Sequence, residues 1–529
     1  MRKLLFAVAA LLLLNSMEAQ NPTVGLQYQT GNEYPGYTLF TPNLNNHVYL
    51  INNCGEKVHE WVFTEPPALT CYLLKNGNLL RAGREALEIR DWDNHVVWSF
   101  LLSKLNLNQH HDIEPLPNGN ILCIVGDQYS AKEMLAMGKD SALVVKNCKL
   151  SKIIELKPVG DSSATVVWEW KFVDHFIQDY DSTRPNYGAV QNHPELIDLN
   201  FDNQRSSDYT HVNSVDYNAE LDQILISARH LSEIYIIDHS TTTAEAAGHT
   251  GGNSGHGGDI LWRWGNPQVY RRGDATDQKL FLQHDAQWVP AGSLDAGKIS
   301  VFNNGGDGTG TFSSVDLIAP VRVQGQYTIL TKSFSPLDFD WSWHGSVYGR
   351  VANEGSMSSM QSLPNGNFMI CETSIGRISE FSKAGELLWT YVNPSGITMA
   401  AQYEEPVQNL IFRAEKYPLD YPGFSGHELA SLGLIEDVNS VSESCVQGVG
   451  IAAVTKEIPT VLNPVQNGVI RFSANIADAE VLVSDVMGRT IYHHPSFSGN
   501  QIQLPLTPGL YIMNVRKGRN LKRYKFISE

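Results

Sequence analysis

Residues 116–125 read LPNGNILCIV, and two other stretches of the chain repeat this pattern. They are LLKNGNLLRAG at residues 73–83 and LPNGNFMICET at residues 363–373. In each stretch, two apolar segments flank an Asn-Gly pair, which supplies the positive backbone angles of a tight turn. The sequence therefore predicts three equivalent β-hairpins.

A second repeated element is a short apolar segment that contains tryptophan. The segments are centred on Trp61, Trp98, Trp168, Trp262, Trp341 and Trp389. One tryptophan strand per unit gives about six units, each too short to bury its own apolar face, as in the blades of a propeller.

Strand patterns dominate the rest of the chain. Apolar and polar residues alternate, Val, Ile, Tyr and Trp are frequent, and the best helical candidate is the short segment SAKEMLAMG around Met134. We therefore predict an all-β fold, with a six-bladed β-propeller over residues 25–430 and a small C-terminal β-sandwich. Long loops are expected at residues 174–205 and 241–258, and such loops on one face of a rigid ring commonly build a binding site.

Composition limits the function classes. The chain has 529 residues, with 39 Lys and Arg against 56 Asp and Glu, which gives a net charge of −17. This acidity argues against nucleic-acid binding, because phosphate contacts need clustered positive charge. The cysteines form no CxxC pair, so metal-site spacing is absent and no disulfide pairing follows from the sequence. They are Cys54, Cys71, Cys123, Cys148, Cys371 and Cys445.

The amino terminus has the pattern of a secretory signal. Arg2 and Lys3 precede an apolar run from Leu4 to Leu14, and a small residue, Ala19, follows. The run is too short for a stable membrane span. We predict a signal peptide at residues 1–19 and an exported protein without a transmembrane segment.

The composition changes near the carboxyl end. Residues 438–457 are small, polar and irregular and indicate a linker, and residues 458–529 contain short strands between NG, GR and PG turns. This tail resembles the C-terminal sorting domain of the type IX secretion system through NPV at Asn463, DVMGR at Asp485 and LPLTPGLYIMNV from Leu504. The resemblance implies the type IX machinery as partner and export through the periplasm and outer membrane to the cell surface or the medium. A carbohydrate-binding sandwich is the alternative, but no aromatic cluster favours it.

Three histidines occupy similar places at the start of strand patterns. They are His111 in HHDIEPLPNGN, His211 in THVN and His284 in QHDAQW. Taken alone, each is more often a hydrogen-bonded structural residue, and the nearby Arg229 is more often a surface ion pair. Their repetition favours convergence on one place. Because neighbours in a strand face opposite ways, only one of His110 and His111 should point inward, and we favour His111.

These motifs together resemble the arylsulfate sulfotransferase family, bacterial enzymes that move a sulfo group from a phenolic sulfate ester to an acceptor phenol. The resemblance spans residues 36–424 and also includes RWGNP, VFNNG and FRAEKYPLDYPGF. It implies a sulfo-histidine intermediate at His284, an acid and base at His211, and sulfate oxygens held by Arg229 and His111. No cofactor or metal is expected.

Two other functions stay open at this stage. A metal-dependent hydrolase would use the three histidines as ligands, and a non-enzymatic propeller would bind glycans or proteins at the cell surface. Residues 249–259, HTGGNSGHGGD, lack the pattern of a nucleotide-phosphate loop, and we interpret them as a mobile loop over the site. Arg413 either lines the pocket or braces the last blade.

Overall fold

The computed structural model describes residues 22–201, 207–436, 465, 468–485, 489–517 and 520–528. The chain divides into two compact units, Met1–Gly448 and Val449–Glu529, which we describe separately. The predicted signal peptide and linker lie outside the described residues, as does Cys445. In the described part of the chain, no helix has the length and apolar character needed to cross a membrane.

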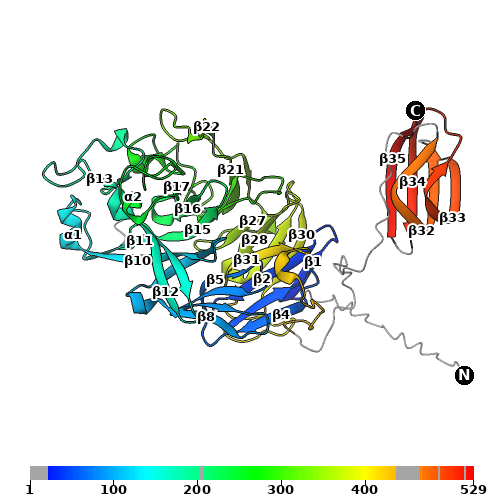
Figure 1. The fold of residues 1–529 in the computed structure, drawn as a ribbon, viewed down its shortest axis with the longest axis horizontal. Helices are drawn as coiled ribbons and strands as arrows, with labels where there is room; N and C mark the ends of the chain where they lie inside the picture. Colours follow the sequence, from blue (N-terminus) through cyan, green and yellow to red (C-terminus); the bar gives the residue numbers. More distant parts are fainter. Residues whose placement is uncertain are drawn as a thin grey trace, which may run out of the picture. The chain divides into compact units, whose positions relative to one another are not determined.

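The first unit is built almost entirely from antiparallel strands, which confirms the all-β prediction (Figure 1). Its described residues form six sheets of four or five strands, numbered here along the chain, besides three two-stranded ribbons. Sheets 1 to 3 contain, in spatial order, β31 (Ile411–Pro418), β2 (Gly36–Pro42), β3 (His47–Ile51) and β4 (Lys57–Val62); β5 (Pro67–Leu73), β6 (Leu79–Gly83), β7 (Ala86–Arg90) and β8 (Val96–Leu101); and β9 (Gln109–Pro115), β10 (Ile121–Ser130), β11 (Asn147–Val159) and β12 (Ser163–Lys171).

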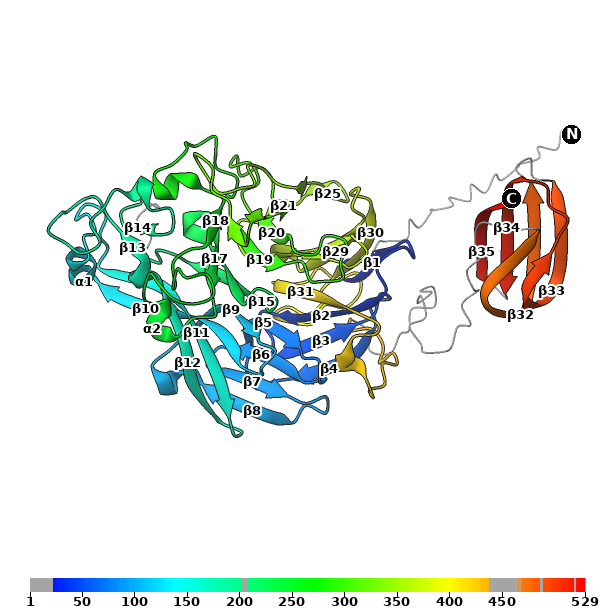
Figure 2. The ribbon, with the colours of Figure 1, turned by 45° about the horizontal axis from the view of Figure 1, so that its top comes forward.

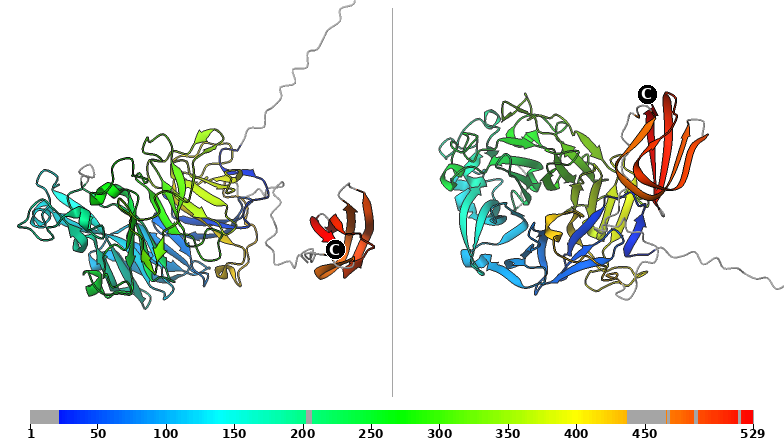
Figure 3. Two further views of the ribbon diagram at one scale, coloured as in Figure 1. Left: turned by 90° about the horizontal axis from the view of Figure 1, so that it is seen from above. Right: turned by 45° about the vertical axis from the view of Figure 1, so that its right-hand side comes forward.

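Sheets 4 to 6 follow the same plan. They contain β15 (Val212–Asn218), β16 (Gln223–Ala228), β17 (Glu233–Asp238) and β18 (Trp262–Trp264); β19 (His284–Trp288), β20 (Ile299–Asn303), β21 (Ser314–Ile318) and β24 (Trp341–Trp343); and β27 (Ser359–Ser362), β28 (Phe368–Glu372), β29 (Arg377–Phe381), β30 (Leu387–Val392) and β1 (Gly25–Gln29). Figures 2 and 3 show the sheets set around a common centre.

The first strands of neighbouring sheets contact one another. β9 lies between β5 and β15, β15 also contacts β19, and β27 contacts β19 and β31. Sheet 1 joins the two ends of the unit, because β31 comes from the end of the unit and β2 from its beginning. Leu39 of β2, for example, pairs with Glu415 of β31. The series of sheets is therefore hydrogen-bonded back onto its own start.

The tryptophan segments are the fourth strands of the sheets, and the indole groups of five of these strands donate a hydrogen bond to the next sheet. The indole nitrogen of Trp61 donates to the carbonyl of Asp91, in the turn before β8. The indole of Trp98 donates to the carbonyl of Ser163, at the start of β12, and that of Trp262 to the carbonyl of Ser335, before β24. The indole of Trp168 donates to the hydroxyl of Thr241, before β18. Trp389 of sheet 6 donates to Asn53, before the fourth strand of sheet 1. These bonds satisfy buried N–H groups while the rings fill the space between sheets.

The three predicted Asn-Gly hairpins are confirmed. They join β5 to β6, β9 to β10 and β27 to β28. Only the glycines have positive φ, at 85°, 84° and 85° for Gly77, Gly119 and Gly366. The asparagines act through their side chains instead: Oδ1 of Asn118, for example, accepts from the backbone N–H of Asn120.

Few other elements occur. The helix expected around Met134 is α1 (Ala131–Ala136), which begins with a capping box between Ser130 and Glu133. The remaining elements used below are η2 (Phe172–His175), α2 (Thr243–Ala246), β22 (Arg322–Val323) and β23 (Gln326–Tyr327).

The second unit contains one antiparallel sheet among its described residues, in the order β33-β32-β34-β35. The strands are β32 (Val469–Asp485), β33 (Thr490–Gln503), β34 (Gly509–Lys517) and β35 (Asn520–Ser528). Val481, Met513 and Phe526 belong to its buried apolar core. The described residues thus show a sheet with its own core, and a second sandwich layer is not seen among them.

Candidate active site

Three first strands carry a bulge where the predicted histidines lie. The pairing registers of β9, β15 and β19 shift near His111, His211 and His284. The backbone is left-handed at His111 (φ 60°), His211 (φ 45°) and Asp285 (φ 57°). Non-glycine residues hold such angles at a cost of about 1–3 kcal/mol each, and such residues cluster at functional sites. The same local distortion therefore repeats in sheets 3, 4 and 5.

His111 and His211 meet directly. Their Nε2 atoms lie 3.1 Å apart, and Nδ1 of His211 lies 3.0 Å from Oδ2 of Asp208. A carboxylate only accepts, so Nδ1 of His211 carries a proton. In the neutral form of His211, Nε2 then accepts a hydrogen bond from the Nε2–H group of His111. Asp208 thus fixes the tautomer of His211, as a carboxylate does for the histidine of a catalytic triad.

Asp208 also supplies a negative charge next to the histidines. Burial would raise its pKa, but the hydrogen bond from His211 and the charge of Lys149, 3.3 Å away, lower the pKa well below its usual range. The carboxylate of Asp208 therefore stays ionised beside His211.

His110 joins the same cluster. Its ring centroid lies 4.3 Å from that of His111 and 5.0 Å from that of His211. Strand alternation predicted that only one of the adjacent histidines would point inward, but the left-handed backbone at His111 interrupts the alternation. Burial lowers the pKa of His110 to about 4 and that of His111 well below its usual value. Both rings are therefore neutral near pH 7.

His284 has a fixed tautomer as well. Its Nδ1 lies 2.7 Å from Oδ1 of Asn304, and its Nε2 accepts the backbone N–H of Met357 at 3.2 Å. The amide of Asn304 cannot be reversed without loss, because Nδ2 donates to the carbonyls of Glu354 and Met357. The proton of His284 is therefore on Nδ1 and the lone pair on Nε2.

Electrostatics keep His284 neutral. It is buried, with 1% of its surface exposed. Burial, followed by the charges of Arg229 and His211, lowers the pKa of His284 to about 3, against the effect of the hydrogen bond to Asn304. The ring of His111 lies 6.1 Å from it. A neutral imidazole with its lone pair on Nε2 is the form that acts as a nucleophile.

Arg229 lies beside His211, since its backbone N–H donates to the carbonyl of His211. Its Nη1 donates to Nε2 of His230, and its Nη2 donates to the carbonyl of Gly355. Its Nε is buried with no protein hydrogen-bond partner among the described residues. A cation with an unused buried N–H beside neutral imidazoles suits an anionic ligand.

Arg413 supports this group of side chains through buried ion pairs. Its guanidinium contacts both carboxylate oxygens of Asp112, at 3.1 and 2.8 Å, and Oδ1 of Asp285 at 2.6 Å. These aspartates directly follow His111 and His284. Burial raises the pKa of Asp285 to about 6, although the charge of Arg413 opposes that rise. Arg413 thus connects sheets 1, 3 and 5 by buried ion pairs.

All four residues predicted for the site, His111, His211, Arg229 and His284, are brought together. Sequence reasoning missed Asn304, Asp208 and His230. Asn304 lies in the VFNNG motif, Asp208 lies three positions before His211, and His230 directly follows Arg229, but the pattern alone gave these residues no role.

The glycine-rich loop does not cover these histidines, contrary to the sequence interpretation. It leaves β17 after Asp238, which pairs with Gln223 at the opposite end of the sheet from Arg229. The separation along β17 is roughly 17 Å. The loop is also held by its own backbone hydrogen bonds, from Gly257 to Gly251 and from Gly258 to Gly248.

Comparison with known proteins identifies the class. Residues 73–394, more than half of the chain, match the family described as Arylsulfotransferase (ASST), and the chain belongs to this family. Family membership supports a sulfotransferase that acts on small molecules. A search of curated protein sequences found no match.

Solved structures show only weak similarity. The chain is similar to a protein of unknown function from Bacteroides caccae, with 13% identity and a TM-score of 0.35 over 68% of this chain and 94% of that chain. It is also similar to a streptogramin B lyase, with 10% identity and a TM-score of 0.35 over 75% and 94% of the two chains. A virginiamycin B lyase from Staphylococcus aureus gives 10% identity and a TM-score of 0.31 over 76% and 91%.

Proposed function

We propose that the first unit is a six-bladed β-propeller that transfers a sulfo group from a phenolic sulfate ester to an acceptor phenol through a sulfo group on Nε2 of His284. The observation that carries the proposal is the meeting of a tautomer-fixed neutral imidazole, an arginine and a carboxylate-oriented histidine at one end of the central strands. The six sheets, the indole contacts between them and the closure of β31 onto β2 support the propeller.

In the first half-reaction, the lone pair of His284 Nε2 attacks the sulfur of the donor. The N–S bond forms, the bond from sulfur to the aryl oxygen breaks, and its electron pair leaves on the phenolate. Protonated His211 gives its Nε2 proton to that oxygen, while Asp208 balances the charge of the ring. Arg229 holds the sulfo oxygens as negative charge shifts during transfer, by analogy with phosphoryl transfer.

The second half-reaction reverses these roles. Nε2 of neutral His211 removes the proton of the acceptor phenol, whose oxygen attacks sulfur. The N–S bond breaks, and its electron pair returns to Nε2 of His284. Donor and acceptor thus use one site in turn, and the sulfo group comes directly from the phenolic ester.

The backbone segment around Met357 must move away from His284 when the donor binds. The backbone N–H of Met357 occupies the lone pair of His284 Nε2, and the carbonyl of Gly355 occupies Nη2 of Arg229. A bound sulfate group would replace both bonds, because its sulfur approaches Nε2 and its oxygens accept from the guanidinium. The protein thus satisfies these polar groups when the donor is absent.

We further propose that residues 458–529 are a type IX secretion sorting domain, that residues 1–19 are a cleaved signal peptide, and that the mature enzyme acts at the cell surface or in the medium. The quoted tail motifs support this, and the disulfide-bonded Cys54 suits an oxidising compartment. Removal of residues 458–529 should retain the enzyme in the periplasm, as cell fractionation would reveal.

Turnover of an aryl sulfate with a phenol, assayed with and without a chelator, tests the function. Sulfo transfer that is unaffected by the chelator supports the proposal. His110, His111 and His211 have ring nitrogens close enough to share a cation, so chelator-sensitive turnover would favour a metal enzyme instead. Binding without turnover would favour the non-enzymatic alternative.

A further inference from the structure

A second histidine cluster lies away from the site. His175 follows β12 in η2, and His249 and Asp259 lie in the glycine-rich loop of sheet 4. Oδ1 of Asp259 lies 3.0 Å from Nδ1 of His175 and 2.7 Å from Nδ1 of His249. The ligand atoms of the three residues all lie within 4.8 Å of one another.

The proton positions at His175 point to a cation. Nε2 of His175 lies 2.9 Å from the carbonyl of Ala246, and a carbonyl only accepts, so Nε2 carries the proton. In the neutral ring, the lone pair of Nδ1 then faces a carboxylate oxygen that also only accepts. His175 is fully buried, so water does not screen this contact. A positive charge resolves the repulsion, either as a second proton on the His175 ring or as a metal ion between the two atoms.

We propose that His175, His249 and Asp259 bind a divalent transition-metal ion, with Zn²⁺ the best match for two imidazoles and one carboxylate. The hydrogen bond from His175 to Ala246 is the outer contact that metal-bound histidines commonly make. Ligands about 2.1 Å from a tetrahedral ion are separated by about 3.4 Å, so the spacings of 3.0 and 2.7 Å need to open by about 0.4 and 0.7 Å.

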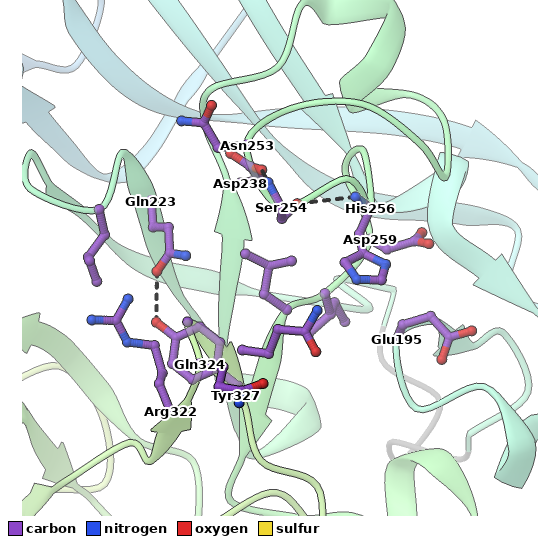
Figure 4. Close-up of a pocket in the computed structure, with 15 residues that line it drawn as sticks. Glu195, Gln223, Asp238, Asn253, Ser254, His256, Asp259, Arg322, Gln324 and Tyr327 are labelled. Atoms are coloured by element: carbon purple, nitrogen blue, oxygen red, sulfur yellow. Dashed lines mark hydrogen bonds between the residues drawn. The ribbon is translucent and has the colours of Figure 1, made fainter.

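The site has an open side. The side chain of His249 is 58% exposed. Asp259 also lines a cavity of about 620 Å³, together with His256 and Glu195, and Figure 4 shows these three residues on one side of it. Water or a cavity ligand can therefore complete the coordination.

The ion would connect two sheets. His175 follows the last strand of sheet 3, and the indole of Trp170 from that strand donates to the carbonyl of Gly258, next to Asp259. The ring of Trp170 also stacks on His175, with centroids 5.3 Å apart. Metal binding would add a strong contact where the loop of sheet 4 meets sheet 3, far from His211 and His284.

Zinc titration of the EDTA-treated full-length protein tests the proposal by calorimetry, with Co²⁺ absorption as a second probe of coordination. The wild type should bind one Zn²⁺ ion at this site, with a Kd about 100-fold or more below that of His249→Ala, because the variant loses a direct ligand. His249 is exposed, so its replacement should not prevent folding. His95→Ala is the matched control, because His95 pairs with Asp91 without a third ligand, and it should bind as the wild type does.

Equal stoichiometry and affinity in the wild type and His249→Ala would overturn the proposal, as would the absence of zinc binding to the wild type. Zinc binding at the other histidine cluster, formed by His110, His111 and His211, would be the same in both proteins and would not contribute to the difference between them. Sulfo transfer by His249→Ala should match the wild type, which separates this test from that of the proposed function.

Discussion

The Nε2 atoms of His111 and His211 lie 3.1 Å apart, although one hundred positions separate these residues in the chain. The contact joins the first strands of sheets 3 and 4, and it exists because both strands have a left-handed residue at the same place. With His284 supplied in the same way by sheet 5, a repeated backbone distortion assembles a site from three sheets.

The pH dependence of the first half-reaction should reflect the buried state of His284. Its pKa is lowered to about 3, so the nucleophile stays neutral at every pH above about 4, whereas an exposed histidine would lose its lone pair below pH 6.5. Single-turnover release of 4-nitrophenolate from 4-nitrophenyl sulfate should therefore not fall between pH 7 and 5. A decline with an apparent pKa near 6.5 would contradict the assignment.

His211→Ala should depend on the leaving group. Weakly basic phenolates leave without protonation, so kcat/KM for their sulfate esters should fall by about 10-fold or less. Basic phenolates need the acid, so kcat/KM for their esters should fall by about 10²–10⁴-fold. A series of substituted aryl sulfates measures this as a steeper dependence of kcat/KM on the pKa of the phenol. A uniform loss across the series would count against the acid role.

Arg229→Lys should not restore what Arg229→Met removes. A lysine keeps the charge but has neither the planar fork nor the contact to His230 that orients it, so both variants should lower kcat/KM by about 10²-fold or more. Arg322→Lys, in the distant β22, is the control and should be unaffected. Full activity in Arg229→Lys would show that only the charge matters.

Arg413→Met should destabilise the first unit by about 3–5 kcal/mol, because it leaves the carboxylates of Asp112 and Asp285 buried without their cation. Urea unfolding followed by tryptophan fluorescence measures the change. Arg184→Ala removes a half-exposed ion pair with Asp181 and should leave the unfolding midpoint unchanged. A similar midpoint for Arg413→Met and the wild type would mean that the buried pairs are not structural.

Much of the sheet architecture could be predicted because its signals are local. A glycine with positive φ marks each Asn-Gly hairpin, and one or two tryptophans mark each fourth strand. The four site residues were found through repetition of a histidine before a strand and through the family motifs.

The contacts that give these residues their chemistry were not predictable in the same way. The tautomer of His284 depends on the orientation of the Asn304 amide, which is set by carbonyls 50 and 53 positions away. The placement of His110 beside His111 depends on a left-handed backbone at a non-glycine residue, which no local pattern indicates. The position of the glycine-rich loop depends on the direction in which β17 runs, and sequence composition carries no information on that direction.

The most direct test is the intact mass of the protein after incubation with an aryl sulfate and no acceptor. The account predicts that the wild type gains one sulfo group, located on His284 by peptide mapping under mildly alkaline conditions, and that addition of phenol removes it. His284→Ala should fold normally, gain no group and lose turnover. Turnover without such an adduct, or an adduct on another residue that persists in His284→Ala, would contradict the account.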